Sequence, residues 1–325
     1  MAAISVKNLS KSFRLYQKEP GLSGSIKSLF HRKFTETKAV DNISFDINEG
    51  ELVGFIGPNG AGKTTTLKIL SGLLHPTSGQ ASVLGFVPWQ RKQAFQRQFA
   101  LVMGQKNQLW WDLPAQESFL LNKEIYEISD SQYKKTISKL SRMLEIEDLL
   151  KIPVRKLSLG QRMKAELVCA LLHSPKVLLL DEPSIGLDVI AQEKMRQFVK
   201  NYNQEFNSTI ILTSHYMGDV LRLCRRVIVL NEGEIIFDGP LEKISAKYSK
   251  EKLFKIQLES QIPKEEFEKL GKVGQYELPL VTITIPRNEA TEKASLILDK
   301  FPISDLTIEE PAIEDIIRHF FERKK

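Results

Sequence analysis

Short, uninterrupted apolar segments alternate with longer amphipathic ones over most of the chain. The apolar runs are typical of strands buried on both faces, and they occupy residues 52–56, 177–180 and 209–213. Apolar residues with helical spacing occupy residues 63–74, 159–173 and 190–206. This alternation predicts a parallel sheet covered by helices, in the α/β class.

The remaining segments before residue 240 predict further strands and a helical region. Alternating polar and apolar residues predict strands at 4–13, at 39–47 and, beyond a turn at Glu49–Gly50, at 51–57. Residues 90–150 read mostly as helix, with a break at the Trp-Trp-Asp-Leu-Pro sequence of 110–114.

The pattern changes after Gly239 and Pro240. The series that follows consists of strands at 254–258 and 281–285, a helix at 288–300, a strand at 303–309 and a helix at 312–323. The chain is therefore expected to end in a small α+β domain of about 80 residues.

The composition is that of a folded protein of about two domains, with 325 residues, 42% of them hydrophobic and 26% charged. No stretch reaches the ~18 consecutive apolar residues of a membrane span, and no secretory apolar segment is expected. Cys169 and Cys224 lie far apart without metal-ligand spacing. A disulfide scaffold and a zinc site are therefore unexpected, and a reducing cytosol fits.

The net charge of +6 is concentrated near the N-terminus. Residues 1–40 contain eight Lys or Arg residues against Glu19 and Glu36, so the rest of the chain is neutral overall. A nucleic-acid surface would spread its charge more widely, so we expect no nucleic-acid partner. A local basic segment indicates a local contact instead.

Residues 57–64 read Gly-Pro-Asn-Gly-Ala-Gly-Lys-Thr and match the phosphate loop G-x-x-x-x-G-K-[ST], with a predicted strand before it and a helix after it. Its backbone N–H groups and the helix N-terminus are suited to bind phosphate. Lys63 is expected to reach the β- and γ-phosphates, and Thr64 to ligate Mg²⁺. The candidate nucleotide contacts are Gly57, Pro58, Asn59, Gly60, Ala61, Gly62, Lys63, Thr64 and Thr65.

Two carboxylates follow the buried run at 177–180. Asp181 is expected to hold Mg²⁺, directly or through water. Glu182 leaves the carboxyl end of the strand, where ligands bind in open α/β sheets, and is placed to polarise the attacking water as a general base. An acidic turn at a strand end is the alternative interpretation.

Four more elements occur in a fixed order around these motifs: Gln105, the sequence LSLGQR at 157–162, the sequence SIGLD at 184–188, and His215. Together the six elements resemble the nucleotide-binding subunit of ATP-binding-cassette (ABC) transporters, over about residues 4–240. The resemblance implies a P-loop NTPase fold of the ABC ATPase type, with an antiparallel β subdomain and a helical subdomain. The implied organisation is an ATPase domain at 1–240, containing a basic insertion at about 17–38 and the helical subdomain at about 90–170, and a C-terminal accessory domain at 241–325.

The resemblance also implies roles within the chain's own ATP site. Phe13 resembles the aromatic residue that stacks on adenine, although Tyr16 competes for that role and Phe13 also suits a core position. Gln105 resembles the glutamine that senses Mg²⁺ and the membrane partner, or is simply solvated. His215 resembles the switch histidine near the γ-phosphate, with a structural histidine as the alternative. The implied Mg²⁺ ligands are Thr64, Gln105 and Asp181.

Other residues are implied to act on the ATP of a second subunit in a head-to-tail dimer that holds two ATP molecules. Ser158, Gly160 and Gln161 resemble the signature sequence that contacts this ATP, and Asp188 resembles the aspartate that couples the two sites. Asp188 also suits a helix N-cap. The usual signature has glycine at the position of Leu159, and we interpret this departure as a subfamily variant.

Three segments concern the partner. Residues 26, 29, 30 and 34 place apolar side chains on one face of a basic helix, so residues 19–35 are expected to touch a permease or lipid headgroups, or to form a packed or solvated loop. Trp110 and Trp111 suit either a partner groove or the core. The C-terminal sequence at 306–317 resembles bacterial drug-, lipid- and sodium-efflux ATPases.

The leading hypothesis is a Mg²⁺-dependent ATPase that drives separate permease subunits, with export favoured over import and a homodimer over a heterodimer. Its expected place is the cytoplasmic face of the inner membrane, as a peripheral subunit. An ABC-type ATPase acting on ribosomes or nucleic acid is the alternative, although it usually has two cassettes or a coiled coil. A small-molecule phosphotransferase would not need the sequence at 157–161.

Overall fold

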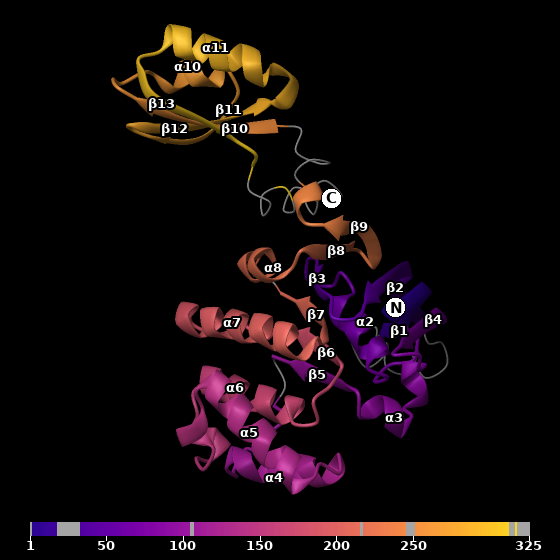
Figure 1. Cartoon of the computed structure of the whole chain (residues 1–325). Coiled ribbons are helices and arrows are strands. Elements are labelled where there is room, and N and C mark those ends of the chain that lie inside the picture. Colours follow the sequence, from indigo (N-terminus) through magenta and orange to yellow (C-terminus); the bar gives the residue numbers. More distant parts are fainter. Residues whose placement is uncertain are drawn as a thin grey trace, which may run out of the picture. The chain divides into compact units, whose positions relative to one another are not determined.

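The computed structural model describes residues 2–17, 33–104, 107–214, 217–244, 251–311 and Ile316. The chain divides into two units, Met1–Gly239 and Pro240–Lys325 (Figure 1). Among the described residues, none of the helices has the length and apolarity needed to cross a membrane.

A six-stranded sheet forms the centre of the first unit. Its strands, in spatial order, are β5 (Phe99–Met103), β6 (Val177–Asp181), β7 (Thr209–Thr213), β3 (Leu52–Ile56), β8 (Arg226–Asn231) and β9 (Glu234–Pro240). The pairs that join β5 through β8 are parallel, and every residue of β6 and β7 is buried, as expected from their apolar runs. The segments that follow β3, β5, β6 and β7 therefore leave the sheet at the same edge.

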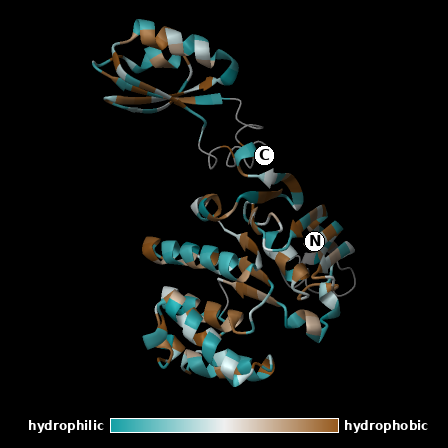
Figure 2. Cartoon of the chain, viewed as in Figure 1, coloured by the Kyte–Doolittle hydropathy of each residue, from teal (hydrophilic) through white to brown (hydrophobic). Residues whose placement is uncertain are grey.

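Different layers cover the two faces of this sheet (Figure 1). On one face, Val53 and Phe55 belong to a core shared with helix α2 and with an antiparallel sheet. The elements of this layer are α2 (Lys63–Leu70), β2 (Lys33–Asn48), β1 (Ala2–Gln17) and β4 (Ser78–Val83), with strand order β2-β1-β4. On the other face Gly54 lies against Val220 of α8 (Met217–Leu223), and α8 packs beside α7 (Val189–Phe206). The visible side of α7 is mainly hydrophilic (Figure 2).

The region expected to be mostly helical contains a strand as well. Its helices are α3 (Gln93–Gln96), α4 (Ala115–Ile125), α5 (Asp130–Leu144) and α6 (Leu159–Leu171), with short 3-10 turns at Pro88–Gln90, Glu147–Leu149 and Val154–Lys156. Both α4 and α5 pack against α6, so α6 is the centre of the helical part. The prediction of helix over residues 90–150 was wrong at β5, because three of its five residues, Ala100, Leu101 and Met103, also favour helices.

The other differences within the first unit concern short or partly polar strands. The sequence pattern did not predict β4, β8 or β9, nor the short helix α8. The strands predicted at 39–47 and 51–57 are present as β2 and β3 but lie in different sheets. The strand expected at 209–213 is present with the same bounds as β7, and the other expected helices and strands of this unit are present with changed bounds.

The second unit is a four-stranded antiparallel sheet, in the order β11-β12-β10-β13, packed against two helices. Its elements in chain order are β10 (Glu251–Leu258), α10 (Lys264–Glu268), β11 (Lys272–Glu277), β12 (Leu280–Pro286), the 3-10 turn Arg287–Glu289, α11 (Ala290–Lys300) and β13 (Ile303–Glu309). This βαββαβ arrangement is the split βαβ motif. The alternating residues of β10 and β12 form its core, whereas α10 and β11 were not predicted, and the helix expected at 312–323 lies outside the described residues apart from Ile316.

Within this unit, the first and last strands are neighbours. Leu253 of β10 pairs with Glu309 of β13, so the beginning of the first strand lies beside the end of the last.

Candidate functional site

The loop between β3 and α2 is tightly held on one side and open on the other. Gly62 precedes α2 with a φ of 102°, and a Cβ there would lie 2.3 Å from the Ala39 carbonyl oxygen, so β2 leaves no room for a side chain. Gly60 has a φ of 81°, and a Cβ there would meet no atom within 4 Å. This exposed turn beside a helix N-terminus has the backbone geometry and the room that a phosphate group needs.

Lys63 spans this loop from the inside. Its side chain is 5% exposed, and Nζ donates hydrogen bonds to the carbonyl oxygens of Gly57 at 2.8 Å and Pro58 at 3.0 Å. Burial lowers the pKa of the ammonium group, while the charges of Glu182 and Asp181 oppose this change. A bound phosphate would supply negative charge to this buried cation.

Asp181 joins the phosphate loop to two strands of the sheet. This residue is 8% exposed; its Oδ2 accepts a hydrogen bond from the Thr64 hydroxyl at 2.8 Å, and its Oδ1 accepts one from the Thr213 hydroxyl at 2.7 Å. Carboxylate and hydroxyl oxygens fit the preference of Mg²⁺. Within the described residues no three His, Cys, Asp or Glu side chains gather into a metal site.

Glu182 is fixed at the end of β6 by its backbone. Its φ of 55° lies in the left-handed region, which is uncommon for glutamate, and its N–H faces the Thr213 hydroxyl and carbonyl oxygens at 3.0 and 3.2 Å. Its carbonyl approaches Gly104 so closely that a Cβ on Gly104 would lie 2.2 Å from the Glu182 oxygen. The turn that carries this carboxylate is therefore determined by both neighbouring strands.

The signature sequence forms the N-terminus of α6. The Ser158 hydroxyl accepts a hydrogen bond from the Gln161 N–H at 3.3 Å, and the Gln161 Oε1 accepts one from the Ser158 N–H at 2.9 Å. This reciprocal capping box leaves the Ser158 hydroxyl proton for a further acceptor but uses the Gln161 side chain within its own helix. Asp188 caps α7, accepting from the Ala191 N–H at 2.8 Å, as its alternative interpretation predicted.

Leu159, the departure from the usual signature, contacts the loop that carries Asp188. A Cβ on Gly186 would lie 2.7 Å from Leu159 Cδ2, so this side chain lies directly over the glycine. The leucine remains 38% exposed, and Val189 and Ile190 beyond it are 77% and 72% exposed.

Of the predicted adenine, Mg²⁺ and γ-phosphate contacts Phe13, Gln105 and His215, the structure describes only Phe13. Phe13 is 36% exposed, pairs across the sheet with Thr37, and has the Lys11 Nζ at 5.2 Å from its ring centroid, so it is not a core residue. Gln105 and His215, together with the Tyr16 side chain, lie outside the described residues.

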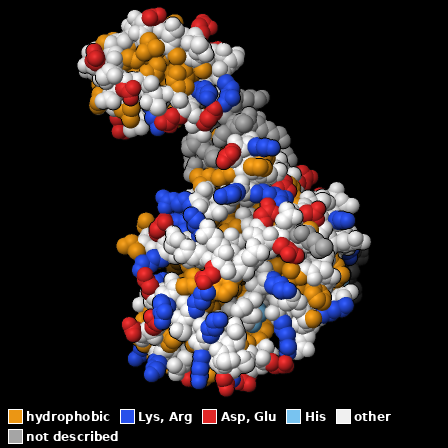
Figure 3. Space-filling model, in the orientation of Figure 1, with side chains coloured by type: hydrophobic (Ala, Val, Ile, Leu, Met, Phe, Trp, Pro, Cys, Tyr) orange, Lys and Arg blue, Asp and Glu red, His pale blue; other side chains and the backbone are white. Residues whose placement is uncertain are grey.

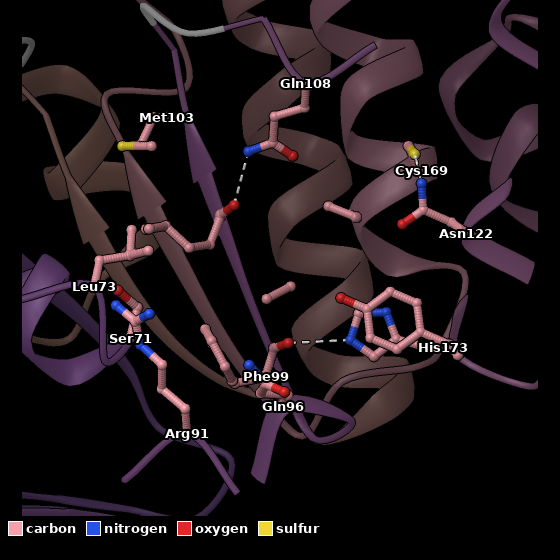
Figure 4. A pocket seen from close by; sticks show the side chains of 14 residues that line it. Ser71, Leu73, Arg91, Gln96, Phe99, Met103, Gln108, Asn122, Cys169 and His173 are labelled. Carbon is pink, nitrogen blue, oxygen red and sulfur yellow. Dashed lines mark hydrogen bonds between the residues drawn. The ribbon is translucent and has the colours of Figure 1, made fainter. Parts of the chain in front are cut away.

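A pocket of about 380 Å³ lies between the parallel sheet and the helical part. Figure 4 shows side chains from both sides of it, including Leu73, Arg91, Met103, Asn122 and His173. His173 stacks on Tyr126 with ring centroids 4.0 Å apart, and its Nε2 lies 3.0 Å from the Phe99 carbonyl oxygen. Burial lowers the pKa of His173, which indicates a neutral ring that donates this hydrogen bond.

Apolar side chains are exposed on the helical part and beside the pocket. Trp110 and Trp111 are 49% and 48% exposed, so the interpretation of these residues as core packing was wrong. On α4, Leu121 and Ile125 are exposed one turn apart, and Leu73 at the pocket is 50% exposed. The basic insertion, predicted at about 17–38, lies outside the described residues at 18–32. Its remainder is strand: residues 33–38 belong to β2, where Phe34 pairs with Tyr16 of β1, so the predicted helical face was wrong at Phe34.

Sequence reasoning missed Glu166, a carboxylate inside α6. It is 1% exposed, its Oε1 lies 3.8 Å from the Arg162 Nε, and the backbone of Gln108 hydrogen-bonds to it. Burial raises the pKa of Glu166 to about 7, and Arg162, which also lies under the Trp111 ring at 5.8 Å, acts against this shift. One sequence feature could have identified Glu166: it is a glutamate among apolar residues that recur at helical spacing.

We expect Glu166 to make the stability of the chain depend on pH. Its folded pKa of about 7 exceeds the ordinary 4.5, so the folded state binds its proton more tightly, and stability falls as pH rises from 4.5 to about 7. The free energy of unfolding should fall by about 3 kcal/mol over this pH range. Urea unfolding at about pH 5 and pH 8 should show this decrease in the native chain and not in Glu166→Gln. Glu147→Gln, at a more exposed glutamate, is the matched control; equal pH dependence in native and Glu166→Gln chains contradicts the prediction.

Comparison with known families gives two matches along the chain. Residues 40–185 match the family described as ABC transporter, and residues 250–309 match the family described as EvrA-like ABC transporter, C-terminal domain.

Curated relatives include two bacterial proteins. The ABC transporter ATP-binding protein NatA of Bacillus subtilis is 34% identical over 66% of this chain and 87% of its own length. The bacitracin transport ATP-binding protein BcrA of Bacillus licheniformis is 32% identical over 67% and 70%, respectively. The rat cholesterol transporter ABCA5 is 27% identical over 89% of this chain, which spans only 19% of that protein.

Solved structures match the first unit. An ATP-binding subunit of an ABC transporter superposes with a TM-score of 0.63 at 26% identity, over 76% of this chain and 93% of the other. A dimeric post-hydrolysis structure of the ATP-binding cassette MJ0796, bound to ADP and Pi, superposes with a TM-score of 0.60 at 26% identity, over 73% and 98%.

Proposed function

Because the chain belongs to the ABC transporter family of ATP-binding proteins, we propose that residues 1–240 are the motor of an exporter whose permease is formed by separate subunits. ABC ATPases bind and hydrolyse ATP, work as dimers and associate with membrane permease components. The observation that carries the proposal for this chain is the contact between the Thr64 hydroxyl and the Asp181 carboxylate, which joins the phosphate loop to the strand that ends at Glu182.

In the proposed site the phosphate loop and Lys63 bind the β- and γ-phosphates, and Phe13 stacks on the adenine. Thr64, Asp181 and Gln105 hold Mg²⁺, which would neutralise charge on the phosphate oxygens. Glu182 accepts a proton from the attacking water. His215 contacts the γ-phosphate as it leaves, and the Lys63 ammonium stabilises the negative charge that develops there.

The proposed dimer is head-to-tail and holds two ATP molecules at its interface. Ser158 and Gly160, at the N-terminus of α6, contact the γ-phosphate held by the partner subunit, because this helix end offers N–H groups and a hydroxyl proton to an anion. Gln161 joins them if its side chain leaves the capping box. Asp188, at the start of α7, couples the two sites, and we favour two identical subunits.

The proposed docking place for the permease is the pocket between β5, α4 and α6. Apolar side chains lie at or near it, and Arg91, whose Nε donates to the Gly72 carbonyl oxygen at 2.7 Å, adds a positive charge to its lining. A cytoplasmic segment of the permease with apolar and acidic side chains would complement this lining. On the face of the first unit seen in Figure 3, basic and acidic side chains are interspersed, which supports a protein partner over nucleic acid.

Export is proposed as the direction of transport. The sequence LSLGQR and the C-terminal sequence at 306–317 resemble bacterial exporter ATPases, and one similar protein is named as a bacitracin transport ATP-binding protein. We assign the chain to the cytoplasmic face of the inner membrane as a peripheral subunit. Residues 241–325 are an accessory domain in this proposal.

Deleting residues 19–32, which leaves β1 and β2 intact, should weaken membrane association and leave soluble ATP hydrolysis unchanged, because the basic amphipathic segment contributes binding to lipid headgroups or permease and not to the ATP site. Membrane and soluble fractions of cells are compared by immunoblotting. Replacing residues 26, 29, 30 and 34 by serine keeps the chain length and removes only the apolar side chains. This variant separates the effect of those side chains from the effect of shortening the chain. Unchanged membrane association together with unchanged transport would remove this role.

The proposed function is tested by purification with its partners. A tagged Glu182→Gln chain is expressed in its native cells, and membranes are solubilised in mild detergent with ATP and Mg²⁺. We expect one or two multi-span proteins at near-equal stoichiometry, and fewer of them with Lys63→Ala. Ribosomal proteins or nucleic-acid factors in their place would favour the alternative of an ABC-type ATPase that acts on ribosomes or nucleic acid.

A further inference from the structure

Asp219, on α8, is a buried carboxylate outside the motifs of the family. This residue is 2% exposed. Its Oδ2 accepts hydrogen bonds from the hydroxyls of Ser184 and Ser214, the second at 2.9 Å, and its Oδ1 accepts one from the Arg196 Nη1 at 2.6 Å. Arg196, whose side chain is 11% exposed, is held in turn by Glu193 on the same helix.

These partners come from the segments that surround the γ-phosphate side of the proposed site. Ser184 lies two residues after Glu182, in the loop that leads to Asp188, and Ser214 directly precedes His215. Arg196 belongs to α7, the helix that Asp188 caps. One carboxylate therefore fixes the loop after β6, the end of β7 and the start of α8 to a single point.

We propose that Asp219 is a positioning residue that holds the loop after Glu182 and the end of β7 at Ser214 in place for hydrolysis, without itself contacting ATP. The proposal rests on the assignment of Glu182 and His215 given above. Its basis is the set of three hydrogen bonds that converge on one buried side chain from three different segments.

A carboxylate suits this position because it accepts hydrogen bonds at both oxygens and donates none when ionised. Two serine hydroxyls and a guanidinium all need acceptors, so asparagine, which offers one oxygen and an NH₂ group, cannot satisfy all three donors. The missing acceptor leaves at least one of these buried donors without a partner. The segments of Ser184 and Ser214 are then no longer tied to one point and can move separately. Since a displacement of about 1 Å at a reacting group is worth up to about 100-fold in rate, the effect should appear in kcat.

The test measures ATP affinity and steady-state hydrolysis of full-length variants. Asp219→Asn should keep the Kd for ATP within about 3-fold and lower kcat by about 10- to 100-fold, with KM little changed. Ser184→Ala removes one donor and leaves the other two in place, so it should fold normally and lower kcat by about 10-fold. Glu205→Gln is the matched control, because this half-exposed glutamate lies on the same helix as Arg196 but pairs with Lys139 of α5, and its kcat should stay native.

A second arm separates positioning from general stability. In a Glu182→Gln background, Asp219→Asn and Ser184→Ala should cause little further loss of kcat, because the group that they position is already absent. The proposal is overturned if both Ser184→Ala and Ser214→Ala keep kcat within about 2-fold of native. It is also overturned if the losses in kcat add fully to that of Glu182→Gln. Near-native turnover of Glu182→Gln alone contradicts the proposed base and not the contacts of Asp219.

Discussion

Replacing Glu182 by glutamine should leave ATP binding intact and lower hydrolysis by at least about 100-fold. Glutamine keeps the size of the side chain but cannot accept the proton of the attacking water. The turn that carries residue 182 is held by backbone contacts to Thr213 and Gly104, which the substitution does not alter. The variant should therefore accumulate in the ATP-bound, dimeric state, visible by size-exclusion chromatography with ATP and Mg²⁺.

Glu127→Gln provides a matched control for this substitution. Glu127 is an exposed glutamate in the helical part with almost the same left-handed backbone, with a φ of 53° against 55° for Glu182. Its hydrolysis rate should equal that of the native chain. Turnover of Glu182→Gln within a few-fold of native would place the catalytic base elsewhere.

Lys63→Ala should lose at least about 10- to 100-fold in ATP affinity, because charge-assisted hydrogen bonds to phosphate contribute about 1.5–3 kcal/mol. The structure gives a further reason to expect a large effect. Lys63 is 5% exposed and its ammonium bonds to two neutral backbone carbonyl oxygens, so a phosphate would add a charged partner to a buried cation. Titration calorimetry with ATP and Mg²⁺ measures the affinity directly.

Lys68→Ala is the control for Lys63→Ala, since Lys68 lies on the same helix but in its last turn, away from the phosphate loop. It should bind ATP like the native chain. A thermal unfolding midpoint close to native in both variants shows that the loop substitution has not unfolded the protein. Unchanged affinity in Lys63→Ala would remove the assignment of the phosphate loop.

The sequence predicted the part of the fold in which local patterns and tertiary contacts agree. Fully apolar runs became β6 and β7, because strands buried on both faces have no polar positions to obscure them. The pattern was insufficient for β5, in which Ala100, Leu101 and Met103 also favour helices, and for β4 and β11, whose residues are mostly polar or exposed. Pairing with neighbouring strands stabilises these segments, and these contacts cannot be predicted from the residue pattern of one segment.

The candidate site shows the same division. Asp181 and the phosphate loop were predicted from motif spacing and strand order, and the structure places the Thr64 hydroxyl on the Asp181 carboxylate. The S-x-x-Q spacing at Ser158 is that of a capping box, but the capping box was not predicted. Ser158 and Gln161 were interpreted only by their resemblance to the signature sequence, which contacts a partner subunit. Asp219 had no sequence feature, because its partners are brought together only by the tertiary fold.

The pairing of β10 with β13 bears on how the C-terminal unit can be handled and exchanged. Since the chain enters and leaves this sheet at adjacent points, all four of its strands come from residues 251–309, and the two ends of that segment lie side by side. Such a unit is portable: it can be excised, grafted onto another cassette or circularly permuted with short linkers while its sheet stays whole. Chimeras that swap residues 240–325 between related ATPases therefore offer a way to ask what this unit adds, independently of the motor.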